Sequence, residues 1–270
     1  MLPPRVFDGV PYLTRVRDST AAYLHAAEPA DCDRLAAHLQ AEFDGLLLSD
    51  AILRQLVDNL NVRGVEAVVF GGWPRDQIMR SDFGYRCPPR DIDLVLSDPS
   101  GGELLDFLDG GGRLNIFGGI AAKTVVTDID LWRIEDTFLI RLLNLPREFA
   151  TLPSTTVFTI NSVVFFPRQF FGQPSVVDGG AIAACRRRMI AFQAREIPFT
   201  HIQVGRAVTY AAKLAFSVDD EVKDFIRDVC SFPGQLDAAR AALQTNCPSE
   251  QRQAAETCLD QILAGGGLSE

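Results

Sequence analysis

Apolar positions repeat at helical spacing soon after the start of the chain. Residues 20–25 show this pattern weakly, and residues 31–43 show it clearly enough to predict a short helix. A second helix begins after Ser49 or Asp50, because either side chain can accept hydrogen bonds from the N–H groups of the first turn, and it ends at Gly64. Its apolar positions share one helix face and are Ile52, Leu53, Leu56, Val57 and Leu60.

The pattern then changes to short apolar runs rich in β-branched residues, which are typical of strands. The first strand, 66–70 (EAVVF), ends in Gly71-Gly72, and the segment WPRDQIMR after it predicts the first turns of a helix. A loop over 81–90 leads to a second strand at 91–96 (DIDLVL). A short helix and three further strands are predicted at 103–108, 113–117, 123–132 and 156–166.

The last part of the chain returns to the helical period. This change at 195–200, from strand-rich to helical sequence, predicts a domain boundary. The helices predicted beyond it are 202–214, 219–229, 235–243 and 250–263.

Composition and charge narrow the functions that the chain can serve. The 270 residues are 47% hydrophobic and carry 26 Lys and Arg against 35 Asp and Glu, a formal net charge of −9. This acidity excludes a generically basic nucleic-acid binder. No apolar run reaches the roughly 18–20 residues of a membrane span, the first residues lack a secretory pattern, and the Cys residues form no CxxC pair. We expect a cytoplasmic protein with reduced thiols and no membrane contact.

Four carboxylates stand out in the strand-rich part. Asp91 and Asp93 share one face of their strand, and Asp128 and Asp130 share one face of theirs, because side chains alternate along a strand. If the two strands are neighbours, these carboxylates converge and repel one another, an arrangement that suits divalent cations such as Mg²⁺ or Mn²⁺. Taken singly, each Asp-x-Asp segment is more typical of a solvated strand face.

The Gly71-Gly72 turn adds a second component to this arrangement. Glycines let backbone N–H groups approach a triphosphate, and the N-terminus of the helix that follows favours an anion. A glycine pair after a strand is usually only a turn. Together with the carboxylates, however, it predicts two-metal nucleotidyl transfer.

Five segments in order resemble one known group of enzymes. FGGWPRDQIM followed by RDIDLVL resembles the GGxVRDxLL…DxD signature of the polymerase-β-like nucleotidyltransferases, and of these most closely the class II tRNA CCA-adding enzymes and bacterial poly(A) polymerases. VFTINSVVF, VVDGGAIAACRRRMI and THIQVGRAVTYAAKLAFSVDDEV resemble later segments of the same group. The resemblance spans residues 64–230. It implies an α+β fold with an N-terminal helical extension (1–63), a head with a small mixed sheet (64–196) and a helical neck (197–265).

The resemblance also implies roles for individual residues. Asp91 and Asp93 match the metal-binding aspartates, and Asp130, with Asp128 beside it, lies where a third carboxylate is often found. The residues that match nucleotide-binding positions are Gly71, Gly72, Arg75, Asp76, Arg133, Asn161 and Arg206.

Two motifs depart from the group. Thr155-Thr156-Val157 replaces an Arg-Arg-Asp segment whose aspartate helps to hold the ribose, so a ribonucleotide preference is in doubt. Phe199-Thr200, with Gln203 beyond it, replaces the Glu-Asp-x-x-Arg segment that pairs with the bases of CTP and ATP. CCA synthesis itself is therefore poorly supported. The sequence after the neck is also shorter than the body and tail domains that grip tRNA.

The sequence predicts a Mg²⁺-dependent nucleotidyltransferase that transfers NMP from an NTP to an acceptor hydroxyl and releases pyrophosphate. RNA, with a tRNA-like 3′ end, is the acceptor that the resemblance implies. The alternatives are nucleotidylation of a protein or small molecule, a non-catalytic nucleotide sensor, and a head that needs a partner chain. The basic cluster Arg186–Arg188 predicts either phosphate binding or a solvated face, and Trp73 is expected to pack against the sheet.

Overall fold

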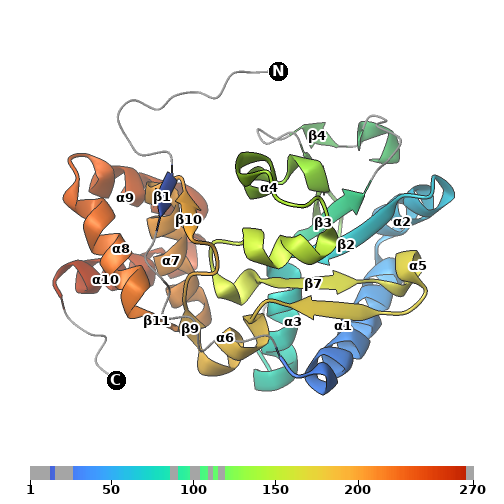
Figure 1. Ribbon diagram of the computed structural model, residues 1–270, viewed down its shortest axis with the longest axis horizontal. Coiled ribbons are helices and arrows are strands. Elements are labelled where there is room, and N and C mark those ends of the chain that lie inside the picture. Colours follow the sequence, from blue (N-terminus) through green and yellow to red (C-terminus); the bar gives the residue numbers. More distant parts are fainter. Residues whose placement is uncertain are drawn as a thin grey trace. The chain divides into compact units, whose positions relative to one another are not determined.

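The computed structural model describes residues 13–15, 27–85, 91–97, 104–108, 112–114 and 119–265. The chain forms two compact units (Figure 1), which are described separately below. Leu24–Arg186 forms the first unit, and Arg187–Glu270 forms the second together with strand β1 (Leu13–Arg15). The N-terminal helices thus belong to the same unit as the sheet. The division into 1–63, 64–196 and 197–265 remains a prediction about domains.

A seven-stranded mixed sheet forms the centre of the first unit, with the strand order β4-β5-β6-β3-β2-β7-β8. Strands β3 and β6 are parallel, and every other neighbouring pair in this sheet is antiparallel. The small mixed sheet expected from the resemblance is thereby confirmed. The strands are β2 (Glu66–Phe70), β3 (Asp91–Ser97), β4 (Arg113–Leu114), β5 (Ile120–Lys123), β6 (Asp128–Arg133), β7 (Val163–Phe166) and β8 (Ser175–Asp178).

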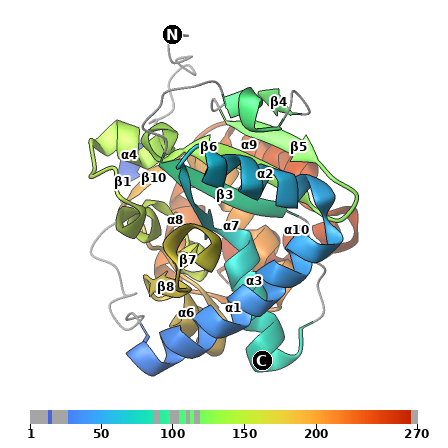
Figure 2. The ribbon, with the colours of Figure 1, turned by 90° about the vertical axis from the view of Figure 1, so that its right-hand side faces the viewer.

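Three helices cover one face of this sheet (Figure 2): α1 (Pro29–Ser49), α2 (Ala51–Val62) and α3 (Gly72–Phe83). Asp50 caps α2, since its carboxylate accepts hydrogen bonds from the N–H groups of Ile52 and Leu53. Trp73 of α3 is 1% exposed and packs against Phe43 of α1 and Phe165 of β7, which confirms its expected structural role. An aromatic cluster therefore joins two helices to strand β7 of the sheet.

The opposite face carries a second apolar cluster. Short elements between β6 and β7 cover it: η3 (Ile134–Asp136), α4 (Phe138–Leu143) and η4 (Phe149–Thr155). The cluster consists of Val68, Phe70, Val95, Ile134, Ile140, Leu152 and Val164. The remaining elements of this unit are η2 (Leu104–Leu108), η5 (Thr159–Asn161), α5 (Arg168–Phe171) and α6 (Ala181–Arg187). Helix α6 ends where the second unit begins in the sequence.

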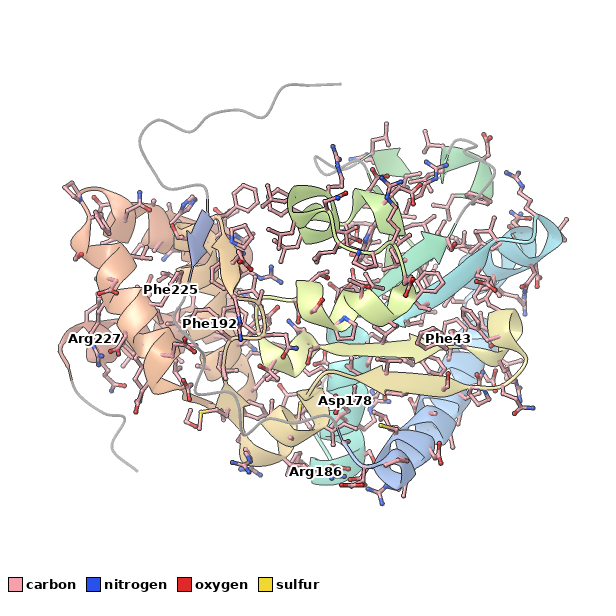
Figure 3. All side chains as sticks on the ribbon, in the orientation of Figure 1. Phe43, Asp178, Arg186, Phe192, Phe225 and Arg227 are labelled. Carbon is pink, nitrogen blue, oxygen red and sulfur yellow. The ribbon has the colours of Figure 1, made fainter. Side chains whose placement is uncertain are left out.

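Helices dominate the second unit, as the sequence predicts. Phe192 and Phe225 meet edge to face in its core with ring centroids 5.1 Å apart (Figure 3). Two short strand pairs, β1 with β10 (Glu196–Pro198) and β9 (Met189–Ile190) with β11 (Ser217–Val218), escaped prediction because they are too short to show a period. The helices are α7 (Thr200–Leu214), α8 (Asp220–Ser231), α9 (Gln235–Asn246) and α10 (Ser249–Leu263). In the part of the chain that the structure describes, no helix is long and apolar enough to cross a membrane.

Four sequence predictions were wrong in their boundaries. The helix predicted over 31–43 runs from Pro29 to Ser49. Segment 123–132 is two strands with a turn at 124–127, because Thr124 and Thr127 hydrogen-bond each other across it. Segment 156–166 contains a 3-10 turn at Thr159–Asn161 and forms a strand only from Val163. Helix α3 continues through Phe83 until Gly84 ends it in the left-handed conformation. The predictions for 20–25, 86–90 and 115–117 lie outside the described residues.

Candidate functional site

The two Asp-x-Asp segments lie side by side in the sheet. Strands β3 and β6 are parallel, with Asp91 opposite Asp128 and Asp93 opposite Asp130. This confirms that the two strands are neighbours. Because side chains two residues apart share a face, and paired residues point the same way, all four carboxylates belong to one face at the start of both strands.

The glycine turn meets this carboxylate face directly. Strand β2 runs antiparallel to β3, and its last residue, Phe70, pairs with Asp93, so that Gly71 comes next to that carboxylate. Gly71 has φ +79°, and a Cβ on it would lie 2.9 Å from Asp93 Oδ2. Both the backbone conformation and the lack of space require glycine here. The next residue, Gly72, begins α3.

Negative charge accumulates at the site. Burial raises the pKa of Asp130, and the charges of Asp91 and Asp128 raise it further. Lys123 lies 3.6 Å from Asp128, but both side chains are largely exposed, and such a pair contributes at most about 1 kcal/mol. The face therefore has the electrostatic character of a cation site, because a bound cation would relieve this repulsion.

The donor set suits a hard divalent ion. Carboxylate oxygens are the ligands that Mg²⁺ and Mn²⁺ prefer, and Asp93 and Asp130 are half-buried while Asp91 is exposed. Within the described ranges, however, no three His, Cys, Asp or Glu side chains already converge as one metal-binding group. The chemistry and the shared face of the donors fit the ion.

Arg75, Asp76 and Asn161 form one buried cluster behind the glycine turn. Arg75 donates from Nε to Asp76 Oδ1 at 2.8 Å and from Nη1 to Asn161 Oδ1 at 2.8 Å. The two charged side chains are only 4% and 9% exposed. The structure thus brings together three of the predicted nucleotide-binding residues, and it links α3 to the 3-10 turn before β7.

The two other predicted arginines belong to strand β6 and helix α7. Arg133 ends β6, and by strand alternation it belongs to the face opposite Asp128 and Asp130. Arg206 belongs to α7 in the second unit, where its Nη2 donates to the Tyr210 hydroxyl at 3.0 Å. Strand alternation thus separates Arg133 from the carboxylate face. The nucleotide-binding roles of both arginines remain predictions.

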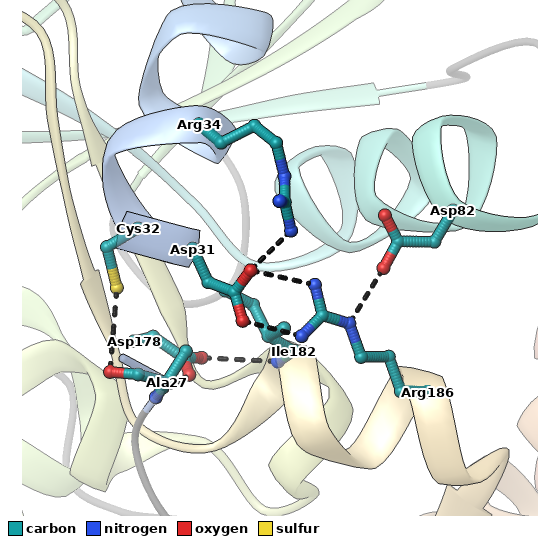
Figure 4. Close-up of polar contacts among 8 residues, drawn as sticks. All are labelled: Ala27, Asp31, Cys32, Arg34, Asp82, Asp178, Ile182 and Arg186. Atoms are coloured by element: carbon teal, nitrogen blue, oxygen red, sulfur yellow. Dashed lines mark hydrogen bonds and ion pairs between the residues drawn. The ribbon is translucent and has the colours of Figure 1, made fainter. Parts of the chain in front are cut away.

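The basic cluster at Arg186 is part of an ion-pair network (Figure 4). Arg186 binds Asp31 of α1 at 2.6 Å and Asp82 of α3 at 2.9 Å. The hydrogen bond from Arg186 is the largest cause of a lowered pKa at Asp31. Arg186 therefore joins α1, α3 and α6, which is a structural role.

Asp178 is a buried residue that the sequence reasoning left without a role. Its carboxylate accepts hydrogen bonds from the N–H groups of Ala27 at 2.9 Å and Ile182 at 3.3 Å (Figure 4). Burial raises its pKa, while these backbone hydrogen bonds act in the opposite direction. The aspartate before Gly179-Gly180 was the available signal, because short acceptors commonly precede a helix.

The sequence matches no protein-family model and no curated protein. Solved structures do match. A CCA-adding enzyme in complex with ATP aligns with a TM-score of 0.56 at 16% identity, over 94% of this chain and 55% of that one. A tRNA nucleotidyltransferase complexed with a primer tRNA and an incoming ATP analogue aligns with a TM-score of 0.56 at 14% identity. The alignment covers 77% of this chain and 60% of that one. A CCA-adding enzyme in complex with CTP aligns with a TM-score of 0.55 at 16% identity, over 94% of this chain and 56% of that one.

The chain shares the fold of these CCA-adding enzymes. This confirms, at the level of fold, the resemblance to polymerase-β-like nucleotidyltransferases seen in the sequence motifs. The chain spans a little over half the length of the solved structures it matches.

Proposed function

We propose that this protein is a nucleotidyltransferase that moves a nucleoside monophosphate from a nucleoside triphosphate to an acceptor hydroxyl. One observation carries the proposal: two Asp-x-Asp segments lie in register on one face, next to a glycine turn that opens a helix. The shared fold supports it. Metal-dependent phosphate chemistry uses carboxylates to hold the ions and a helix N-terminus to bind the anion.

Asp91, Asp93 and Asp130 would hold Mg²⁺ or Mn²⁺, with Asp128 beside them. When bound, the ions neutralise the triphosphate and lower the pKa of the attacking hydroxyl. Gly71 leaves room for close approach, and the first-turn N–H groups of α3 provide positive potential for the phosphates.

The reaction balances as a displacement at the α-phosphorus. The acceptor oxygen forms a new P–O bond there, the bond to the β-phosphate breaks, and pyrophosphate leaves. Asp130 lies opposite Asp93 across the two strands, and we propose that it receives the proton of the acceptor hydroxyl.

The acceptor that we propose is an RNA 3′ end of tRNA-like form. The complexes of similar fold support this choice, since one of them holds a primer tRNA. A protein or small-molecule acceptor is the second candidate. It is favoured by the net charge of −9 and by the absence of the Glu-Asp-x-x-Arg base-reading pattern, where this chain has Phe199, Thr200 and a buried Gln203.

The ribose side of the site also differs. Val157 stands where the resembling enzymes have a ribose-holding aspartate, and its side chain has no polar atom. Thr155 and Thr156, just before it, donate their hydroxyl protons to the carbonyls of Leu152 and Pro153, at 2.7 and 2.9 Å. These hydroxyls are engaged in the backbone of their own turn. We therefore expect the enzyme to discriminate weakly between NTPs and the corresponding dNTPs.

The test supplies each α-labelled NTP and dNTP with Mg²⁺ to the purified protein, with total cellular RNA in one reaction and protein extract in another. Asp91→Asn/Asp93→Asn is the inactive variant. Asp58→Asn, which removes an exposed carboxylate on α2 far from this strand pair in sequence, is the matched control. EDTA replaces Mg²⁺ in a parallel set.

Label in RNA with the wild-type and Asp58→Asn proteins, and not with the double variant or EDTA, establishes RNA transfer and identifies the nucleotide. Label in a protein band, with the same dependence, establishes the second candidate and excludes the first. Nucleotide binding without transfer in every reaction contradicts the enzymatic proposal and supports the sensor alternative.

A further inference from the structure

Helix α2 is hydrogen-bonded at both of its ends to segments that adjoin the outer strands of the sheet. At its C-terminal end, Asn59 Nδ2 donates to the Phe107 carbonyl at 3.2 Å, and Arg63 Nη2 donates to the Asp106 carbonyl at 3.2 Å. The Arg63 guanidinium also lies 4.8 Å above the Phe107 ring. These contacts fix η2, which precedes β4 in the chain.

At the other end, the buried carboxylate of Asp50 makes two kinds of contact. Oδ1 accepts the N–H groups of Ile52 and Leu53, each at 3.1 Å, and so caps α2. Oδ2 accepts the hydroxyl of Thr124, which lies in the turn between β5 and β6. The Asp50 side chain therefore joins the start of α2 to the turn that leads into the carboxylate-bearing strand.

Thr124 organises that turn. Its Oγ1 accepts the N–H groups of Val126 at 3.1 Å and Thr127 at 2.9 Å, and its own N–H donates to the Thr127 carbonyl at 3.0 Å. The Thr127 carbonyl, 2.6 Å from Oγ1, competes with Asp50 for the single hydroxyl proton. A charged acceptor makes the stronger hydrogen bond, so the proton favours Asp50.

The position of this anchor matters because β6 begins directly after the turn. A one-residue slip of β6 against β3 would move Asp128 and Asp130 to the opposite face of the sheet. On its other side β6 pairs only with β5, a strand of four residues. The Asp50–Thr124 hydrogen bond gives the turn a fixed point outside the sheet.

We infer that Asp50 and Thr124 are positioning residues for Asp130, and that the N-terminal helices are thus part of the catalytic scaffold. Only the expected effect of these residues on catalysis rests on the proposed function. The structural part, that the hydrogen bond holds β6 in register, is measurable without turnover.

Thr124→Val removes the hydroxyl at nearly constant volume, and Thr124→Ser restores it. Asp50→Ser keeps an N-cap acceptor for α2 but is too short to provide the second oxygen, so it breaks the same contact from the other partner. Asp50→Asn is less informative, because its amide group can donate to Thr124 Oγ1. The double variant Thr124→Val/Asp50→Ser tests whether both changes act through one contact.

The first readout is amide hydrogen exchange of the β6 segment in the full-length protein. We expect Thr124→Val and Asp50→Ser to speed exchange there, with the aromatic core around Trp73 unchanged and Thr124→Ser close to wild type. The second readout is Mn²⁺ binding, measured by electron paramagnetic resonance. We expect Thr124→Val and Asp50→Ser to bind Mn²⁺ about 10–100-fold more weakly than the wild type. In the transfer assay, kcat falls by a similar factor while KM for the nucleotide stays within about twofold.

Unchanged β6 exchange in Thr124→Val overturns the inference, as does a Thr124→Ser variant that behaves like Thr124→Val. A double variant clearly worse than either single one shows two separate roles and also overturns it. If wild-type protein neither transfers nucleotide nor binds Mn²⁺, the proposed function fails, and hydrogen exchange alone still decides the register-holding role.

Discussion

The Asp93 carboxylate lies directly against the backbone of Gly71, so close that a Cβ on that glycine would come within 2.9 Å of Oδ2. The antiparallel pairing of β2 with β3 produces this approach, because it brings the end of one strand next to the start of the other. The glycine turn and Asp93, which are far apart in the sequence, are therefore one structural unit.

Replacing Gly71 by alanine is expected to impair both stability and function. The residue has φ +79°, a conformation that costs a side-chain-bearing residue about 1–3 kcal/mol, and the new methyl group would push Asp93 aside. Chemical denaturation and the transfer assay measure the two effects. Gly64→Ala is the control, since φ is +68° there but nothing lies within 4 Å of the added Cβ. Equal activity losses in the two variants would contradict the Asp93 explanation.

Asp130→Asn is expected to stabilise the metal-free protein and to reduce nucleotidyl transfer strongly. The pKa of Asp130 is raised, so the folded state binds a proton more tightly than the unfolded state, and wild-type stability falls as pH rises through that interval. Removing the charge should raise the free energy of unfolding by about 0.2–1 kcal/mol at pH 7, the range for cross-strand pairs.

This gain should shrink as pH falls, because wild-type Asp130 then becomes protonated and neutral. Urea unfolding in EDTA at pH 7 and pH 4 measures the difference. Asp58→Asn, on the exposed side of α2, should show no comparable pH-dependent gain. A destabilised Asp130→Asn protein at pH 7 would mean that Asp130 is held by favourable contacts and not by repulsion.

Arg75→Gln is expected to destabilise the protein by about 3–5 kcal/mol. The change leaves the buried Asp76 carboxylate without its adjacent guanidinium, and a buried charge that loses its partner is costly. Arg80→Gln on the same helix removes a half-exposed ion pair with Glu42 and should cost at most about 1 kcal/mol. Thermal unfolding of the two variants compares them, and similar losses would exclude the buried-charge explanation.

We expect Arg186→Gln to lower the free energy of unfolding at neutral pH. We also expect the free energy of unfolding of this variant to fall less steeply than that of the wild type as the pH is lowered. The pKa of Asp31 is lowered below 3.8 mainly by its hydrogen bond with Arg186, so this contribution is present above the unfolded pKa and is lost as pH falls through the folded one. The difference in free energy of unfolding between variant and wild type should therefore become smaller below pH 4. A difference that stays constant from pH 7 to pH 2.5 would show that the ion pair does not cause it.

The sequence predicted most of the elements of the sheet unit and the residues of its carboxylate face. Helix α2 with a cap at Ser49 or Asp50, strands β2 and β3 and the glycine turn follow from local patterns, because capping, alternation and glycine chemistry act over a few residues. The turn at 124–127 escaped prediction, since the hydrogen bonds of Thr124 leave no periodic signal.

By itself, the sequence determined that Asp91 shares a strand face with Asp93, and Asp128 with Asp130, because alternation within a strand is a local property. Only the tertiary structure decided that these two strands pair in parallel and in register, and that Asp50, far earlier in the chain, holds the turn between β5 and β6. Pairing between distant segments depends on the packing of the whole sheet and its helices, and one strand carries no record of its partner.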